Sequence, residues 1–394
     1  MSEPIASEPT LKALGDLAAE AGIAHIHMLA WRDLDDVEAG GSELHAHRVA
    51  SIWAQAGLQV TMRTSFAPGR PARRVRSGYT VIRKAGRYLV FPRSVASEIT
   101  GRLGPRDGLV EIWNGMPFFS PLWCRGPRMV WLHHVHGPMW GMTLPPNLAK
   151  VGVALEETIA PKFYRRSPIV TLSESSKAEL VHDLGFRPDR VTVVPPGIDG
   201  SFSPGGERSA RPLMVAVGRL VPVKDFARLI RLAVRVREDV PDLQLVIVGE
   251  GYERDQLEAQ ITDAGADDWV RLAGRVSDEE LISLYRQAWI VASVSSREGW
   301  GMTLTEAAAC GTPAVATRIA GHTDAVTDGQ GGILADGDDE LVDAMRRVLT
   351  DEALRARLAT GALTRAAALT WESTAIGTFS VLAADAARRA RQRQ

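Results

Sequence analysis

The sequence lacks the features that define several protein classes. Cys124 and Cys310 are its only cysteines, so it cannot form a disulfide framework or a cysteine-based zinc cluster. No apolar run reaches the ~18–20 residues needed to span a bilayer. Residues 1–21 include acids and have neither the basic nor the apolar region of a signal peptide. We therefore expect a cytoplasmic protein with reduced thiols and no transmembrane segment.

An excess of charge of either sign is also missing. The formal net charge is −1, from 46 basic and 47 acidic residues, so bulk charge indicates no nucleic-acid partner. Hydrophobic residues make up 45% of the chain and charged residues 24%, which is typical of a globular protein. A length of 394 residues favours two domains over one.

The chain does show a regular alternation of apolar runs and helical segments. In the second half, six predicted strands alternate with helices, which is the pattern of a doubly wound α/β domain. The first half opens with a strand, a glycine loop, a helix and a second strand over residues 23–63, which predicts a parallel sheet. A segment rich in Gly, Ser, Pro and Arg, residues 199–212, separates the halves. We predict two Rossmann-like domains, residues 1–198 and 199–370, and a C-terminal helix, residues 371–394.

One predicted strand–helix junction carries two carboxylates. Glu298 and Glu306 bracket the glycines Gly299 and Gly301, and a helix is predicted from Thr303. The first N–H groups of a helix lack intrahelical partners and can bind an anion, whereas carboxylates suit hydroxyl groups. The stretch therefore suits a sugar joined to a diphosphate. An ordinary junction with solvated acids has the same pattern.

Two further loops could hold phosphate. Arg219 and Lys224 flank a loop that follows a predicted strand and opens into a helix, where two cations could clamp a diphosphate or be merely solvated. Gly40 and Gly41 precede a predicted helix and could admit phosphate close to the backbone. They do not form the GxGxxG dinucleotide fingerprint, and a plain tight turn explains them equally well.

Residues 69–93 contain eight basic side chains, which we interpret first as a solvated basic face. The functional alternative is attraction to an anionic acceptor or to acidic lipid headgroups, worth ~1 kcal/mol per basic residue. Asp33-Leu34-Asp35 has the form of a metal-binding Asp-x-Asp motif, but it lies in a first-half loop. We expect these two acids to face solvent.

Taken together, the motifs resemble those of the retaining family-4 glycosyltransferases of the GT-B fold. Gly-Arg-x4-Lys at residues 218–224 and Glu-x7-Glu at residues 298–306 occur in the family's order and spacing. The resemblance covers roughly residues 23–385 and implies that the C-terminal helix crosses back onto the first domain. The remaining matching segments are residues 40–41, 133, 173–175, 194–199, 248–251, 274–276 and 309–313.

The resemblance implies roles for individual residues. Arg219 and Lys224 would neutralise the nucleotide diphosphate and stabilise the leaving group. Glu298 would hold hydroxyls of the donor sugar, and Glu306 would bind the ribose. His133 would contact the donor sugar, with His134 and His136 as alternatives. The other donor-binding residues would be Gly40, Gly41, Gly218, Gly249, Glu250, Gly251, Arg275, Val276, Gly299, Trp300, Gly301, Met302, Thr303 and Leu304, with Trp300 where the family usually has Phe.

The implied activity is transfer of a sugar from a UDP- or GDP-sugar to an acceptor hydroxyl, with retention and without a metal or other cofactor. A sugar-nucleotide epimerase or a glycosyl phosphorylase of the same fold is an alternative, as is a non-enzymatic sugar-nucleotide sensor. The acceptor would be a small molecule, a glycan or a lipid-linked sugar, and association with the inner face of the membrane is a hypothesis. Residues 117–146, which include Trp123, Trp131 and Trp140, match no acceptor pattern.

Overall fold

The computed structural model describes residues 6–36, 39–137, 140–141 and 145–393. Its internal contacts divide the chain into two compact units. The first unit consists of Glu3–Gly197 and Thr370–Gln394, and the second of Ile198–Leu369. Among the described residues, the chain therefore enters the second unit once, at Ile198, and leaves it once, at Leu369.

The first unit is built on an eight-stranded sheet in the order β3-β4-β2-β1-β5-β6-β7-β8. All neighbouring strands are parallel except β3 and β4, which form an antiparallel hairpin at the edge. Ser77 and Gly78 connect this hairpin, both with positive φ, as the twist of a two-residue turn requires. The strands are β1 (His25–Leu29), β2 (Gln59–Thr64), β3 (Arg73–Arg76), β4 (Tyr79–Arg83), β5 (Gly108–Trp113), β6 (Arg128–Leu132), β7 (Ile169–Thr171) and β8 (Val191–Val193).

Helices cover both faces of this sheet. A π-helical turn, η1 (Ala154–Ile159), joins α6 to α7, and its backbone pattern is one that recurs at functional sites. The helices are α1 (Glu8–Ala21), α2 (Gly41–Gln55), α3 (Val90–Ile99), α4 (Ser120–Trp123), α6 (Pro146–Val153), α7 (Ala160–Tyr164), α8 (Glu174–His182) and the 3-10 turn η2 (Pro188–Arg190).

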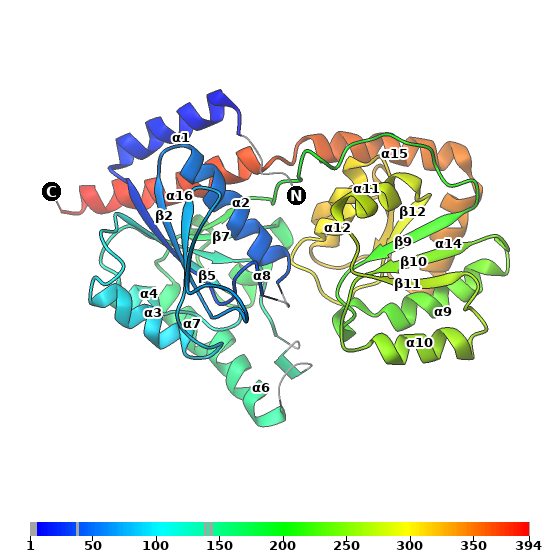
Figure 1. Cartoon of the computed structure of the whole chain (residues 1–394), viewed down its shortest axis with the longest axis horizontal. Helices are drawn as coiled ribbons and strands as arrows, with labels where there is room; N and C mark the ends of the chain where they lie inside the picture. Colours follow the sequence, from blue (N-terminus) through cyan, green and yellow to red (C-terminus); the bar gives the residue numbers. More distant parts are fainter. Residues whose placement is uncertain (1–5, 37–38, 138–139, 142–144, 394) are drawn as a thin grey trace. The chain divides into compact units, whose positions relative to one another are not determined.

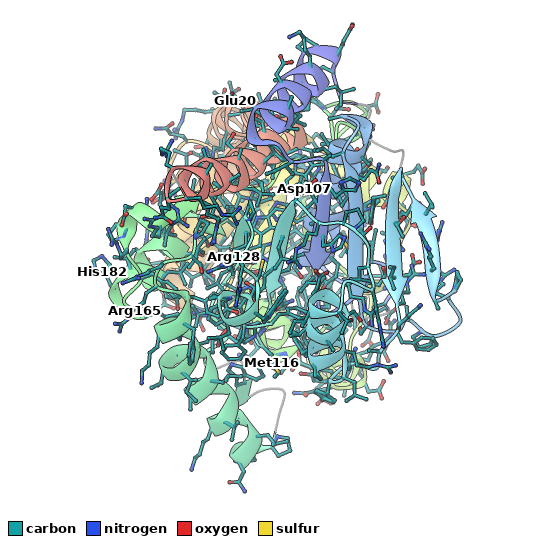
Figure 2. The ribbon with its side chains drawn as sticks, turned by 90° about the vertical axis from the view of Figure 1, so that its left-hand side faces the viewer. Glu20, Asp107, Met116, Arg128, Arg165 and His182 are labelled. Atoms are coloured by element: carbon teal, nitrogen blue, oxygen red, sulfur yellow. The ribbon has the colours of Figure 1, made fainter. Side chains whose placement is uncertain are left out.

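The C-terminal helix α16 (Trp371–Arg391) belongs to the first unit, which confirms the predicted return of the chain. It packs against α1, α2, β5 and β6. Asp385 of α16 accepts a hydrogen bond from the backbone N–H of Arg128 at the start of β6 (3.0 Å), and Figure 2 shows the helix beside this end of the sheet. Gly197 permits the return, because a Cβ there would lie 2.1 Å from the Trp371 backbone nitrogen.

The second unit is a six-stranded parallel sheet in the order β11-β10-β9-β12-β13-β14, the predicted doubly wound form. Its central strands are buried on both faces and therefore read as continuous apolar runs. Helices α9 and α10 lie on one side of the sheet and α11 and α12 on the other (Figure 1). The strands are β9 (Leu213–Val217), β10 (Gln244–Val248), β11 (Val270–Gly274), β12 (Ile290–Ser293), β13 (Ala314–Thr317) and β14 (Gly332–Ala335).

Helix α9 shows how the sequence specifies this packing. Asp225 begins the helix by accepting a hydrogen bond from the Arg228 N–H (3.2 Å), while Leu229, Ala233 and Val236 face the core. The helices are η3 (Pro222–Lys224), α9 (Phe226–Arg237), α10 (Arg254–Asp263), α11 (Asp278–Gln287), α12 (Met302–Ala309), α13 (His322–Ala325), α14 (Asp338–Thr350) and α15 (Glu352–Ala367).

Candidate functional site

The centre of the candidate site in the second unit is an ion pair between Lys224 and Glu298. Lys224 ends the 3-10 turn η3 after β9, and its ammonium group contacts Glu298 Oε1. The Lys224 side chain passes over Gly218, where an added Cβ would lie 3.2 Å from Lys224 Cε. The glycine of the Gly-Arg-x4-Lys motif thus leaves room for the lysine of the same motif.

The environment of Glu298 favours its anionic form. Burial acts to raise the pKa of its carboxyl, but the charges of Lys224 and His322 and two hydrogen bonds outweigh burial and place the pKa below its usual value. One of these bonds comes from the Ser295 hydroxyl at 2.9 Å. Only 16% of the Glu298 side-chain surface is exposed.

A buried histidine, His322, lies next to the loop that carries Glu298. His322 begins α13, and its Nδ1 lies 2.9 Å from the Thr317 carbonyl oxygen, which requires that Nδ1 carry the proton. Its Nε2 lies 3.3 Å from the Ser293 hydroxyl. At the preceding residue, Gly321, a Cβ would lie 2.6 Å from the Glu298 carbonyl oxygen, so the two loops touch through backbone. Sequence reasoning missed His322, although the Gly-His pair follows a predicted strand.

Glu306 lies about one turn after the start of α12, and its environment differs from that of Glu298. Gly301, with φ of 106°, begins α12, and Glu306 accepts a hydrogen bond from the buried Tyr285 hydroxyl (3.2 Å). Burial raises the pKa of Glu306 to about 7, and the Tyr285 bond only partly opposes this effect. The two carboxylates of the motif therefore differ in charge state near neutral pH.

The other predicted donor-binding residues of the second unit fall into two groups. Arg219, Glu250 and Arg275 are exposed, whereas Trp300 is buried beneath the loop and lies 5.8 Å from the Arg365 guanidinium. Gly249 has a reason within the fold, because a Cβ there would lie 1.9 Å from the Gly218 carbonyl oxygen. The remaining residues, Gly251, Val276, Gly299, Met302, Thr303 and Leu304, follow β10, β11 and β12 or begin α12.

In the first unit, Gly40 and Gly41 begin α2 after β1. Glu43 accepts a hydrogen bond from the Gly40 N–H (2.8 Å) and pairs with buried Arg32 (3.2 Å). Gly41 itself is exposed. The glycine pair is thus fixed at a helix start. This position is compatible both with a loop that admits phosphate and with a plain tight turn.

His133 follows β6 and is only 4% exposed. Its Nε2 lies 3.0 Å from Nδ1 of His45, a residue of α2. Burial lowers the pKa of His133 to about 4, so the ring is neutral at physiological pH. His134 and His136 are half-buried and stack at 4.9 Å. All three histidines remain candidates for the donor sugar, and His133 is the most deeply placed.

A buried carboxylate organises the loop that follows His133. Glu156, on the π-helical turn η1, accepts hydrogen bonds from the backbone N–H groups of His136 (3.0 Å) and Gly137 (3.2 Å) and from the Trp140 indole (2.9 Å). The indole packs against Gly152, where any Cβ would lie within 3 Å of the ring. Of the three tryptophans of residues 117–146, Trp131 is fully buried, Trp123 lies near the Arg106 guanidinium (5.6 Å), and Trp140 lies beside His136 (5.3 Å between ring centroids).

The structure corrects two predictions about charged residues. Asp33 is not solvent-facing, because it is 1% exposed. It binds Arg76 through two hydrogen bonds (3.0 and 3.3 Å) and Arg83 through one (2.9 Å). Arg83 has no exposed surface and Arg76 only 8%, so the stretch at residues 69–93 is not simply a solvated basic face. A buried guanidinium requires a carboxylate, but these partners are 43 and 50 positions apart and show no sequence signal.

Among the described residues, no group of three or more His, Cys, Asp or Glu side chains could hold a metal ion. No described helix is long and apolar enough to cross a membrane. Cys124 and Cys310 are both free and buried.

Comparison with known families covers most of the chain. Residues 39–202 match the family Glycosyltransferase Family 4, and residues 199–365 match Glycosyl transferases group 1. Two relatives, each a D-inositol 3-phosphate glycosyltransferase, come from Acidothermus cellulolyticus and Salinispora arenicola. The first is 30% identical and the alignment covers 87% of this chain and 85% of the relative. The second is 35% identical and the alignment covers 87% of each.

Solved structures agree on the fold. Sucrose-phosphate synthase from Thermosynechococcus elongatus superposes with a TM-score of 0.77 at 19% identity, covering 90% of this chain and 97% of that one. A protein of Anabaena solved in complex with UDP and glucose gives a TM-score of 0.71 at 18% identity, covering 91% and 98%. These neighbours are GT-B glycosyltransferases, so the predicted fold is confirmed.

Proposed function

Because the chain belongs to the group 1, family-4 glycosyltransferases, we propose that it moves a sugar from a nucleoside diphosphate sugar to an acceptor hydroxyl, with retention and without a metal ion. The observation that carries the proposal is the pairing of Lys224 with Glu298 in the turn that also leads to Glu306. The loops that follow the neighbouring strands β9 and β12 would thus together offer a cation for phosphate, an anion for sugar hydroxyls and a second carboxyl for ribose.

The chemical step breaks the bond between the anomeric carbon and the diphosphate oxygen. The acceptor oxygen bonds to that carbon on the same face, and its proton passes to the departing diphosphate. Negative charge builds on the diphosphate as the bond breaks, and Arg219, Lys224 and the first N–H groups of α12 would compensate it. Preorganised compensation of this kind is usually the largest catalytic contribution.

The ion pair between Lys224 and Glu298 indicates different roles for Lys224 and Arg219 in donor binding. Glu298 partly offsets the Lys224 charge before the donor binds, whereas Arg219 is exposed and, among the residues that the structure describes, has no ion-pair partner. We infer that Arg219 supplies attraction for the diphosphate and that Lys224 joins sugar and phosphate recognition. Glu306 would accept a ribose hydroxyl in its anionic form.

Thermal-shift measurements with nucleoside diphosphates and their sugars test the donor, because a ligand that binds the native state raises Tm by mass action. UDP is the first to try, since structural neighbours were solved with it. D-inositol 3-phosphate is the first acceptor, following the names of the relatives. We expect an α-linked product from an α-linked donor, formed equally well in EDTA. No nucleotide-induced Tm rise and no transfer from any donor would contradict the proposal.

The same assay separates the alternatives. An epimerase would convert the donor without an acceptor, and a phosphorylase would depend on inorganic phosphate. A sensor would bind the donor and never turn it over. The predicted peripheral membrane association also remains a proposal, and equal binding to anionic and neutral vesicles would contradict it.

A further inference from the structure

One helical run of the first unit carries a stripe of apolar side chains on its outside. The helix α6, the π-helical turn η1 and the helix α7 follow one another without a break over residues 146–164. One line of this run, at helical spacing, is buried: Ala149, Gly152, Glu156, Ala160 and Tyr164. The residue before each of these is apolar, and these five residues form the apolar stripe: Leu148, Val151, Leu155, Ile159 and Phe163.

The stripe lies on the surface of the first unit. Residues one position apart on a helix are separated by about 100° around its axis, so the stripe runs beside the buried line. Four of its members are well exposed: Leu148 (56%), Val151 (63%), Ile159 (44%) and Phe163 (42%). The α6 end of the stripe projects from the rest of the first unit (Figure 1 and Figure 2).

The stripe continues onto a neighbouring helix. The Phe163 ring meets the Phe119 ring edge to face, with 5.8 Å between centroids, and α7 packs against α4. Leu122 of α4 lies one turn after Phe119 and is 62% exposed. The exposed apolar surface therefore extends over two elements and is larger than a single helix face.

Basic side chains border the stripe. Four exposed cations belong to the helical run or directly follow it: Lys150, Lys162, Arg165 and Arg166. In the described part of the chain, none of the four forms an ion pair. Lys150 and Lys162 each precede a stripe residue, so they lie on the outer side of the stripe.

The negative charge of the run lies elsewhere. Within residues 146–166, all of which the structure describes, Glu157 is the only exposed acid. It follows the buried Glu156, so it lies on the opposite side of the buried line from the stripe. Its Oε1 lies 3.7 Å from the place of a Cβ at Gly137. The stripe and its border therefore present apolar and positive groups only.

This combination fits an anionic lipid surface. Helices that lie in a membrane interface place apolar side chains between the acyl chains and Lys or Arg at the headgroup phosphates. A second copy of the chain fits less well, because a two-fold symmetric interface repeats the same patch on both partners. It would bring the four unpaired cations against their own copies, and like charges in an interface oppose association.

We propose that the apolar stripe and its basic border dock the first unit on an anionic bilayer, with Leu148 and Val151 entering the interface. The inference rests on the proposed peripheral association and names its surface, but it does not require the transfer activity. The basic stretch at residues 69–93 is a different surface, and its Arg76 and Arg83 are buried against Asp33.

Vesicle flotation of the full chain tests the docking. We expect the parent to bind vesicles of equal parts phosphatidylcholine and phosphatidylglycerol at least about tenfold better than phosphatidylcholine alone. Leu148→Gln with Val151→Gln should reduce this binding at least about tenfold by removing apolar surface. Glutamine forms helices nearly as well as leucine, so α6 should persist. No preference of the parent for anionic vesicles would overturn the proposal.

A matched control has the same exposure on another face of the first unit. Leu89 and Ile99 are 58% and 63% exposed and lie at the two ends of α3, next to the basic stretch. Leu89→Gln with Ile99→Gln should leave vesicle binding within twofold of the parent. A loss as large as that of the α6 variant would overturn the choice of surface. So would a fall in mass of the α6 variant by light scattering, since it would identify the stripe as a contact between copies.

The basic border has its own test. Lys150→Gln with Lys162→Gln should weaken binding to anionic vesicles about fivefold for each charge removed. The difference from the parent should shrink in high salt, which screens exposed charges. Arg231→Gln with Arg271→Gln removes two exposed cations of the second unit and should leave binding within twofold. An equal loss in that control would show that bulk charge drives binding and would overturn the role of the border.

A fluorescent label shows whether the stripe enters the interface. Cys124 and Cys310 are buried, so Val151→Cys provides an accessible thiol for a polarity-sensitive dye. We expect its emission to shift to the blue with anionic vesicles and that of labelled Ile99→Cys to stay unchanged. Equal emission of the Val151→Cys label with and without vesicles would overturn the insertion. Transfer is not needed for any of these readouts, so its absence would contradict the proposed function alone.

Discussion

Lys224 and Glu298 lie 74 positions apart and form a direct ion pair at the carboxyl ends of two neighbouring strands, β9 and β12. The pair joins the two motifs that the sequence shows separately. It also means that neither charge is free before a ligand binds. The consequences for substitution differ between the two residues.

The first prediction concerns this pair. Lys224→Met and Glu298→Gln should each reduce kcat by roughly 10²–10³-fold, the usual effect of removing one preorganised charge contact. Lys224→Met should also weaken UDP binding, whereas Glu298→Gln should not, because it removes a negative charge from the neighbourhood of the diphosphate. Steady-state kinetics and UDP titration measure both effects.

A control for these variants is available in the same unit. Arg228 pairs with Asp338 at 2.6 Å on the surface, so Arg228→Met removes an ion pair that the proposed mechanism does not use. It should leave kcat and UDP affinity unchanged. Near parental kcat in both Lys224→Met and Glu298→Gln would show that the donor site lies elsewhere.

The second prediction uses the raised pKa of Glu306, about 7 in the folded protein against 4.5 normally. Between these values the folded state binds more protons than the unfolded state, so stability falls as pH rises through this window. Glu306→Gln removes this loss. The Tm of the variant relative to the parent should therefore be higher at pH 8 than at pH 5.

Ligand binding should show the opposite dependence. If the anionic carboxylate accepts a ribose hydroxyl, UDP affinity of the parent should rise as pH increases through about 7. Tyr285→Phe removes a hydrogen bond that stabilises the anion and should move this midpoint to higher pH. A UDP affinity that does not change between pH 6 and 8 would argue against ribose recognition by Glu306.

The fold class and the donor motifs can be predicted from the sequence because both depend on local patterns of residues. Apolar runs predict β9 and β10, and glycine and charge spacing mark the loops that hold Lys224 and Glu298. The edge hairpin β3–β4 is different. Its antiparallel pairing departs from the predicted parallel sheet. Ser77 and Gly78 form a tight turn with positive φ, but the basic residues on either side hide the alternation of apolar and polar residues that would predict a hairpin.

The residues that support the sites were not predictable in the same way. His322, His45 and Glu156 act through partners that the fold brings from other elements. No spacing rule links Glu156 to Trp140, 16 positions earlier in the chain, because a π-helical turn sets its direction. The burial of Arg83 has no sequence signal for the same reason, since only the fold shows that Arg83 meets Asp33.

The third prediction tests the buried network of Asp33. Burial acts to raise the pKa of Asp33, but hydrogen bonds from Arg76 and Arg83 outweigh burial and place it below 3.8. Asp33→Asn removes the more deeply buried of the two carboxylates that Arg76 and Arg83 share, since Asp35 also pairs with both (2.7 and 2.8 Å). The substitution should cost about 1–3 kcal/mol of unfolding free energy. Urea unfolding at pH 7 measures the loss.

The pH dependence and a control sharpen this test. A carboxylate with a lowered pKa contributes its stability above the unfolded pKa and loses it as pH falls through the folded value. The difference between parent and Asp33→Asn should therefore shrink below about pH 3.8. Asp16→Asn breaks an exposed pair with Lys12 and should not shift the urea midpoint measurably. A similarly small effect of Asp33→Asn would contradict the buried network.

The last prediction places acceptor recognition in the loop held by Glu156. Glu156→Gln replaces one accepting oxygen by an N–H donor that faces the N–H groups of Gly137 and Trp140. Loosening this loop should raise the acceptor KM by roughly tenfold, equivalent to about 1.4 kcal/mol. If the donor sugar contacts His133 and not His136, donor hydrolysis without acceptor should not change, because the donor contacts proposed for the second unit remain intact. Glu20→Gln, on the exposed face of α1 (Figure 2), should alter neither quantity. An equal loss of donor hydrolysis and acceptor transfer in Glu156→Gln would show that Glu156 supports the fold of the first unit instead of its acceptor loop.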